Sequence, residues 1–245
     1  MIVGWWSGGV TSAVTCYLCI KLYGRENCRF IFIDTKNEDR DTYRFKTDCE
    51  KWWGGVIETI TGLGKGEYAS GKYESIEDVW IKHKSLNVAH GAICSSELKK
   101  VVREKWQKDN DYTYQAFGFD VDEVKRAKSI KMNHPKTKPI FPLLMFGLQK
   151  KDCLDILAEH NIEAPRMYKL GFHNNNCFGK SDTSIGGCVQ GGIGYWQKLK
   201  REYREKWEKM ADMEHKLTDM RGEPVTMLKD QSAEASSSGL SLIHI

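Results

Sequence analysis

Two glycines and three hydroxyl side chains are grouped near the start of the chain, in residues 7–12 (SGGVTS). Glycine lets a backbone approach an anion closely, and the start of a following helix offers unpaired N–H groups and the positive end of a dipole. The hydroxyls of Ser7, Thr11 and Ser12 add donors. No Gly-Lys-Ser/Thr follows, so this is not a Walker A loop. The pattern predicts a phosphate-binding loop; the alternative is an ordinary turn between a strand and a helix.

Acidic residues follow two apolar runs. Asp34 and Thr35 come directly after residues 29–33 (RFIFI), and the run 112–119 is followed by a charged cluster made of Asp120, Asp122, Glu123 and Arg126. Carboxylates in such places can hold Mg²⁺ or contact a substrate. Glu123 and Arg126 are three apart and can also simply pair on a helix. For each carboxylate the alternative is helix capping or contact with solvent.

The eight cysteines divide into two groups. Cys94, Cys177 and Cys188 lie in basic or Gly- and Asn-rich segments, where thiolates are accessible and stabilised by cations or metals. We expect these three to come together in space. The other five lie in apolar helix or strand patterns typical of small buried side chains: Cys16, Cys19, Cys28, Cys49 and Cys153. All of these except Cys49 are expected to be buried singly.

The elements that must position these residues alternate along the chain. Apolar runs predict strands at 1–6, 29–34, 56–60 and 112–119, and helical patterns cover 10–22, 39–53 and 76–84. Such alternation predicts an α/β nucleotide-binding fold, a parallel sheet covered on both faces. Ligands then bind at the carboxyl ends of the strands.

Seven apolar residues recur every three or four positions in the charged segment 198–220: Leu199, Tyr203, Trp207, Met210, Met213, Leu217 and Met220. They predict a helix that packs back on the chain or forms a homodimer, with nucleic-acid binding as the alternative. The predicted organisation is a nucleotide-binding domain at 1–145, a part with the cysteine loop and this helix at 146–230, and a disordered Ser/Ala-rich tail at 231–245.

Composition excludes several classes of protein. The 245 residues are 40% apolar and include eight tryptophans, which excludes a generally disordered chain. No stretch reaches the ~20 apolar residues of a membrane span. No secretory signal is expected at the start, so we predict a cytoplasmic protein with reduced thiols. The net charge of +4 permits nucleic-acid contact without requiring it.

The loop at 7–12 resembles the pyrophosphate loop of the adenine-nucleotide α-hydrolase (PP-loop) superfamily. Over about residues 1–215 the chain is similar to the phosphoadenosine phosphosulfate (PAPS) reductase family, especially its short phage versions. The motifs that carry the resemblance stand in family order: 32–38 (FIDTKNE), 41–44 (DTYR), 94–100 (CSSELKK), 118–127 (GFDVDEVKRA), 141–143 (FPL), 171–177 (GFHNNNC) and 188–196 (CVQGGIGYW).

The resemblance implies a Rossmann-like (HUP-type) parallel sheet with helices on both faces and a helical C-terminal extension. It implies that ATP, PAPS or adenosine phosphosulfate (APS) binds with Mg²⁺, its adenosine near Asp34 and Thr35. The phosphates would rest on Ser7, Gly8, Gly9, Thr11 and Ser12. Many superfamily members have Asp where this chain has Thr11, so Asp34, Asp120, Asp122 and Glu123 are the candidates to supply the missing charge. Asp120, Glu123 and Arg126 match the catalytic cleft of relatives.

Cluster-bearing relatives hold a [4Fe–4S] cluster through a cysteine at the Cys94 motif and others at a later Cys-x-x-Cys-like element. Ten residues separate Cys177 from Cys188 here. A three-cysteine cluster with one open iron site, a zinc site with His173 as fourth ligand, and free thiols are the three alternatives. Residues 174–176, three asparagines, either contact polar groups of a substrate or form a turn.

Three functions follow from the resemblance. The first is an enzyme that cleaves ATP at the α-phosphate and adenylylates a substrate oxygen, which sulfur or nitrogen then replaces. An iron–sulfur cluster would carry the sulfide, and a nucleobase or nucleic acid would be the acceptor. The second is PAPS or APS reduction. Reductases of the family use a cysteine in a flexible C-terminal segment, and this sequence has none after Cys188, so Cys177 or Cys188 would have to serve. The third is a non-catalytic nucleotide-binding subunit of a defence or modification complex.

Overall fold

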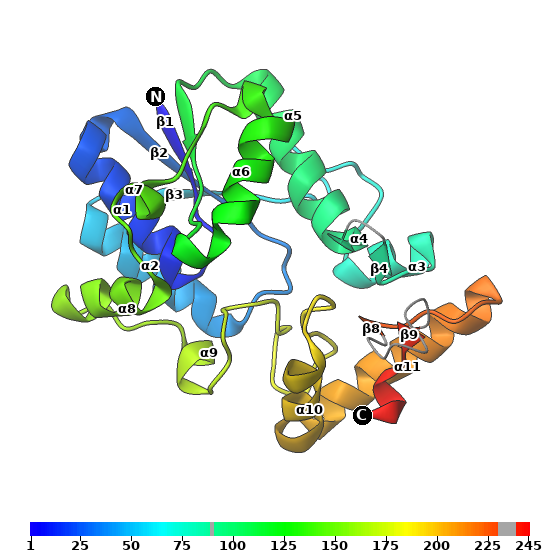
Figure 1. Cartoon of the computed structure of the whole chain (residues 1–245). Helices are drawn as coiled ribbons and strands as arrows, with labels where there is room; N and C mark the ends of the chain where they lie inside the picture. Colours follow the sequence, from blue (N-terminus) through cyan, green and yellow to red (C-terminus); the bar gives the residue numbers. More distant parts are fainter. Residues whose placement is uncertain (89–90, 230–238) are drawn as a thin grey trace. The chain divides into compact units, whose positions relative to one another are not determined.

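A computed structural model of the chain describes residues 1–88, 91–229 and 239–245. These residues form two compact units. The first unit contains residues 1–33, 41–60 and 106–175; the second contains residues 34–40, 61–105 and 176–245. The units do not follow the predicted division at 145/146, because the chain leaves the first unit after β2 and β3 and later returns to it. The order of the elements can be followed in Figure 1.

All strands of the first unit form one parallel sheet. Its order is β3-β2-β1-β6-β7, with β1 at Ile2–Trp5, β2 at Cys28–Ile33, β3 at Ile57–Ile60, β6 at Tyr114–Ala116 and β7 at Pro139–Ile140. The four strands expected from the sequence are confirmed. The fifth, β7, was not predicted because two residues beginning with proline give no apolar run. The strand order reverses between β1 and β6, which makes the ends of these two strands the expected ligand site.

Side chains from alternate strand positions bury both faces of this sheet. Ile2 and Trp6, with Phe30 and Phe32 of β2, belong to a core shared with α1 (Val10–Tyr23) and α2 (Arg40–Trp53). On the opposite face the ring of Trp5 lies 5.4 Å from that of Trp106, at the end of α5 (Val101–Asp109). The predicted α/β fold with helices on both faces is therefore confirmed.

The remaining helices complete the two units. The first unit adds α6 (Val124–Asn133), α7 (Pro142–Met145), α8 (Lys150–Glu159) and α9 (Arg166–Lys169). The second contains α3 (Ile76–His83), α4 (Ile93–Ser95), a π-helical turn at Ser96–Lys100, α10 (Ile193–Glu202) and α11 (Arg204–Arg221), with the short strands β4 (Asn87–Val88), β5 (Gly91–Ala92), β8 (Leu228–Lys229) and β9 (Gly239–Leu240). Within the described ranges, no helix has the length and apolarity to span a bilayer.

The expected C-terminal helix is two helices. The chain leaves helical geometry at Tyr203 (φ −136°, ψ 54°), which separates α10 from α11. Most of the seven apolar residues predicted to share one helix face are buried within the chain, so the helices pack back on it. Met220, the last of the seven, is exposed. Residues 239–245 of the expected disordered tail form β9 and a 3₁₀ turn, because Leu242 is buried and donates its N–H to the Glu214 carboxylate (2.8 Å). The rest of that tail, through residue 238, lies outside the described residues.

Candidate functional site

The loop at 7–12 leads from β1 into the start of α1. Gly8 has φ +85°, a left-handed conformation that favours glycine, and Gly9 is the N-cap of α1 with no side-chain cap. The Ser12 hydroxyl donates to the Gly9 carbonyl (2.8 Å) and accepts from the Ser7 N–H (3.0 Å). This closes the loop on itself, while the first-turn amides of α1 have no intrahelical acceptor.

A second glycine brings the end of β6 against this loop. A Cβ on Gly118 would lie 2.8 Å from both N and Cα of Ser12, which real side chains do not tolerate. Glycine at this position therefore allows the backbone after β6 to contact the first turn of α1. The loop at 7–12 thus lies at the β1–β6 reversal, where the strand order places the expected ligand site.

Two residues from the segment after α8 also contact the loop. The Val10 N–H, at the first position of α1, donates to the Tyr168 hydroxyl (3.3 Å). The Asn175 side-chain amide donates to the Gly8 carbonyl (2.8 Å) and to the Thr42 hydroxyl (2.9 Å). Sequence reasoning singled out Asn175 within the asparagine run but missed Tyr168, since an isolated tyrosine in a four-residue helix gives no pattern.

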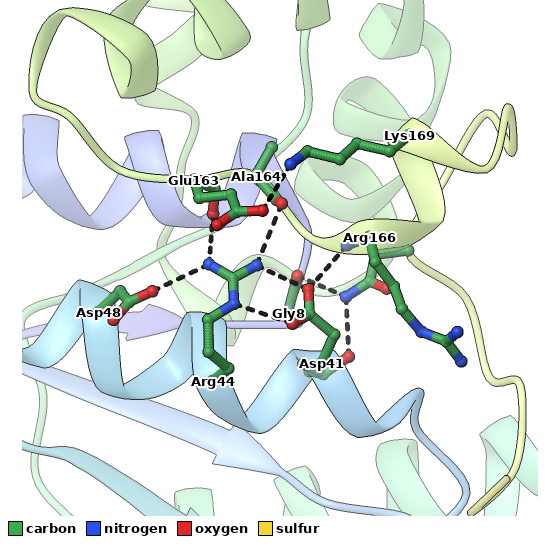
Figure 2. Close-up of polar contacts among 10 residues, drawn as sticks. Gly8, Asp41, Arg44, Asp48, Glu163, Ala164, Arg166 and Lys169 are labelled. Atoms are coloured by element: carbon green, nitrogen blue, oxygen red, sulfur yellow. Dashed lines mark hydrogen bonds and ion pairs between the residues drawn. The ribbon is translucent and has the colours of Figure 1, made fainter.

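Arg44 fixes the segment that carries Tyr168 to α2 (Figure 2). All five of its N–H donors are used. Two bonds run to the Asp41 carboxylate (2.9 and 2.6 Å), one to Asp48 (2.9 Å), and one each to the backbone carbonyls of Glu163 (2.7 Å) and Ala164 (3.1 Å). Asp41 also accepts the backbone N–H of Arg166 (2.7 Å), the first residue of α9. We call Asp41, Arg44 and Asp48 the α2 clamp.

The α2 clamp predicts an acid-sensitive contribution to stability. The hydrogen bonds from Arg44, opposed by burial, hold the pKa of Asp41 below its ordinary value. A depressed folded pKa gives stability that is present above the unfolded value of about 3.9 and is lost as pH falls through the folded value. We expect Asp41→Asn to lower the free energy of unfolding by about 1–3 kcal/mol at pH 7. The deficit should shrink as the pH falls from 5 to 3.

Thermal melting of wild type and Asp41→Asn across pH 3–7 measures this difference. Asp155→Asn is the matched control, because Asp155 pairs with Lys151 on an exposed surface of α8, where an ion pair contributes little. A deficit for Asp41→Asn that stays constant down to pH 3 would contradict the assignment.

The predicted charged cluster after β6 is engaged with itself. Asp120 is buried and its carboxylate accepts the Asp122 N–H (3.1 Å), which caps the short turn that leads into α6. Glu123 pairs with Arg126, whose guanidinium lies 4.5 Å from the Phe119 ring centroid. The structure thus contains both helix capping and ion pairing, the two alternatives to a catalytic role for these residues.

The His173–Asn174 turn is held by a lysine that sequence reasoning missed. Lys150, at the start of α8, donates to the His173 carbonyl (3.1 Å) and to the Asn174 side-chain oxygen (2.8 Å), and its Nζ lies 2.9 Å from His173 Nε2. Burial lowers the pKa of Lys150, although the Asp120 charge opposes the shift. This part of the asparagine run is therefore a fixed turn.

Asp34 and Thr35 belong to the second unit, where both are buried. Asp34 accepts the Lys36 N–H (2.7 Å) and pairs with the Lys36 ammonium (2.8 Å). Thr35 donates to Glu38 (3.0 Å), which also accepts from Lys99 (3.2 Å). Glu38 is the last residue of the motif at 32–38, but the sequence pattern indicated no role for it.

Cys94, Cys177 and Cys188 all lie near Lys99 in the second unit. Burial raises the pKa of all three thiols, and the Lys99 charge partly offsets that rise in each. The charge of Cys188 also raises the pKa of Cys94, and the charges of Cys188 and Cys94 raise that of Cys177. The Cys177 thiol lies 3.9 Å from Glu38 and 4.0 Å from the Thr35 hydroxyl. Burial therefore favours the neutral thiol form of all three cysteines.

Two side chains of the C-terminal helices hold the cysteine loop. The Tyr195 hydroxyl accepts the Cys188 N–H (3.1 Å) and donates to the Cys177 carbonyl (3.4 Å), so it joins the two cysteines. Lys206, fully buried in α11, donates to the carbonyls of Phe178, Ser181 and Ser184 at 2.5, 2.9 and 2.7 Å. Both cysteines thus lie in a fixed loop.

The three thiols, as they lie, do not fit a cluster or a zinc ion. Across residues 1–88, 91–229 and 239–245, no group of three or more His, Cys, Asp or Glu side chains is placed as metal ligands.

The other five cysteines are buried, as predicted, but not singly. Cys16, Cys19, Cys28 and Cys49 lie close enough for the charges of the other three to raise the pKa of Cys16, after burial itself. Burial raises the pKa of Cys19 and of Cys153 to about 12. All five pack in the core between the sheet and α1, α2 and α8. They are packing residues rather than reactive thiols.

Comparison with known proteins agrees with this geometry. The family described as the phosphoadenosine phosphosulfate reductase domain matches residues 1–187. No curated protein matches the chain. A crystal structure of phosphoadenylyl-sulfate (PAPS) reductase from Candida auris, as a phosphate complex, is similar at a TM-score of 0.52 and 14% identity, over 72% of this chain and 81% of that one. At that identity the likeness shows the fold alone. Because the family match covers most of the sequence, the chain belongs to the phosphoadenosine phosphosulfate reductase family.

Proposed function

We propose that this chain is an enzyme that binds ATP, or a related adenylyl nucleotide, with its phosphates on residues 7–12 and transfers the adenylyl group to an acceptor oxygen. The first turn of α1 is the observation that carries the proposal. The N-cap Gly9 has no side chain to cap the helix, and Gly8 is in the left-handed conformation. The Ser12 hydroxyl donates to the Gly9 carbonyl and so closes the loop. Such a helix start attracts phosphate through both hydrogen bonds and the helix dipole.

In the proposed reaction the acceptor oxygen attacks the α-phosphorus of ATP. The bond from that phosphorus to the oxygen bridging the β-phosphate breaks, and pyrophosphate leaves. A sulfide donor or an amine then adds to the activated carbon, and AMP departs with the former acceptor oxygen. The loop amides would orient the phosphates and neutralise the charge that develops on pyrophosphate, which is most of what such a transfer needs from a protein.

A nucleobase, free or within a nucleic acid, is the proposed acceptor because its ring carbonyl supplies an oxygen that adenylylation activates. Two stretches rich in lysine and arginine, 99–103 and 198–204, do not add support for nucleic acid. Lys99 pairs with Glu38, Lys198 and Arg201 pair with Glu202, and Arg204 pairs with Glu208. Their charges are used within the chain, so the proposal rests on the nucleotide loop.

Reduction of PAPS or APS is the second candidate, favoured by the family match. A cysteine thiolate would attack the sulfonate sulfur, the sulfur–oxygen bond to the nucleotide phosphate would break, and a dithiol reductant would release sulfite from the resulting S-sulfocysteine. That step needs a thiol able to move between substrate and reductant. Cys177 and Cys188 are instead held by Tyr195, and burial raises their pKa. We therefore rank reduction second.

One assay separates the candidates. Anaerobically purified protein is incubated either with MgATP and nucleobase acceptors or with PAPS and thioredoxin. Pyrophosphate and sulfite are then measured separately. We expect acceptor-dependent pyrophosphate and no thioredoxin-dependent sulfite. Sulfite that disappears in Cys188→Ser would make the chain a reductase. Nucleotide binding without either product would favour the non-catalytic subunit. Iron, sulfide and zinc analysis of the same sample tests for a cluster or zinc, either of which requires the thiols to rearrange.

A further inference from the structure

The Tyr168 hydroxyl has one hydrogen-bonding capacity left, and it is a donor. Its oxygen accepts the Val10 N–H (3.3 Å) and the backbone N–H of Asn175. A phenol oxygen that accepts two hydrogen bonds has only its own proton left to share. Among the residues that the structure describes, that proton has no acceptor. An acceptor from outside the chain would complete its hydrogen bonding.

The hydroxyl lies beside the proposed phosphate position. A Cβ added to Gly9, the N-cap of α1, would lie 3.3 Å from the Tyr168 oxygen, so this oxygen stands directly over the cap residue. The amide that it accepts from, Val10, is the first of the orphan donors of the helix. A group bound at the start of α1 therefore meets this hydroxyl along with the backbone amides.

We propose that Tyr168 is a phosphate-binding residue of this site: its O–H donates to a phosphate oxygen of the nucleotide. The inference rests on the proposed function, because it requires a phosphate at residues 7–12. It adds a side-chain donor to a loop whose own Ser12 hydroxyl is already occupied by Gly9.

The chemistry favours donation to an anion. A hydroxyl that accepts from backbone amides is polarised by them and becomes a stronger donor. Hydrogen bonds to a charged oxygen are shorter and stronger than neutral ones. Burial raises the pKa of Tyr168, although the bonds from Val10 and Asn175 oppose the shift, so the phenol keeps its proton at neutral pH.

The α2 clamp positions this donor. Arg44 holds the carbonyls of Glu163 and Ala164, and Asp41 holds the N–H of Arg166, two residues before Tyr168. Because α9 has only four residues, its placement depends on such anchors. Asp41 and Arg44 are therefore positioning residues, and a lysine at 44 cannot reproduce the five-donor fork.

The test compares Tyr168→Phe with wild type by calorimetric titration with ATP and with adenosine. We expect the Kd for ATP to rise about tenfold or more, as the loss of one charge-assisted bond implies, with the Kd for adenosine unchanged. Tyr17→Phe is the matched control. Tyr17 lies two turns further along α1, and its hydroxyl pairs with His160 (3.0 Å). The Tyr17→Phe variant should bind ATP with the affinity of wild type.

A merely structural tyrosine would change both affinities or neither, so the ATP-to-adenosine ratio is the decisive quantity. Tyr168→Phe that binds ATP as well as wild type, or more tightly because the hydroxyl only blocks the loop, overturns the assignment and leaves the proposed function intact. Wild type that binds neither ATP nor PAPS overturns both. If Tyr168→Phe has a markedly lower melting temperature than wild type, Arg44→Lys provides a second test, because it should weaken the binding of ATP but not of adenosine. An unchanged ratio of the two Kd values in Arg44→Lys would contradict the positioning role of the α2 clamp.

Discussion

Gly9→Val is expected to abolish nucleotide binding and leave the fold intact. Gly9 has φ −92° and ψ 161°, an extended conformation that valine adopts without strain. Only the Tyr168 oxygen (3.3 Å) and the Ser7 hydroxyl (4.0 Å) lie near a Cβ at this position, so the backbone need not move. The branched side chain would instead stand over the first-turn amides of α1. We expect the Kd for ATP to rise at least about a hundredfold, roughly 2.7 kcal/mol.

Gly192→Val is the matched control for this variant. Gly192 is also a helix N-cap in extended conformation (φ −74°, ψ 178°), at the start of α10, and has open space around its Cβ position. Both variants lose about the same N-cap preference, worth about 1 kcal/mol or a few degrees in melting temperature. Only Gly9→Val should lose ATP in calorimetry. Equal affinities in the two variants would remove residues 7–12 from the nucleotide site.

The sheet, and the turn at 7–12 between β1 and α1, were predictable from the sequence because their signals are local. Residues 7–12 lie within one turn between two elements, and residues 29–33 form a single apolar run. The strand order could not be read in this way. It depends on which strands pair, and β7 contributes only Pro139 and Ile140 to that pairing.

The residues that sequence reasoning missed act through contacts between distant segments. Tyr168 meets Val10, and Arg44 meets the carbonyl of Glu163 across more than a hundred positions. One residue of each pair lies in an unremarkable context, and a single sequence does not indicate the pairing. The buried cysteines were predicted correctly as packing residues but not as neighbours, because Cys16, Cys28 and Cys49 lie on three different elements.

The burial of Lys206 could not be predicted from the sequence either. A lysine in a charged helical segment is predicted to face solvent, since lysine is rarely buried. In the structure Lys206 is fully buried, and its three ammonium protons match three carbonyls of the loop between Cys177 and Cys188. The loop, which has few regular backbone hydrogen bonds of its own, is thus organised around one cation.

Lys206→Met is accordingly expected to destabilise the second unit strongly. Methionine fills similar space, but it leaves the carbonyls of Phe178, Ser181 and Ser184 buried without their donor. Each such loss costs about 1–3 kcal/mol, and the three are not additive, so we expect a total of about 3 kcal/mol or more. Because the loop loosens, the thiols of Cys177 and Cys188 should also react faster with a disulfide reagent than in wild type.

Lys209→Met, one turn away on α11, isolates the effect of burial. Lys209 also donates to a loop carbonyl, that of Thr183 (2.8 Å), but it is exposed and pairs with Glu205. Water can replace its bonds, so its loss should cost at most about 0.5 kcal/mol. Denaturant unfolding and thiol-reaction rates measure both variants. If Lys206→Met were as stable as Lys209→Met, with unchanged thiol reactivity, the loop would be held by its other contacts, and Lys206 would not organise it.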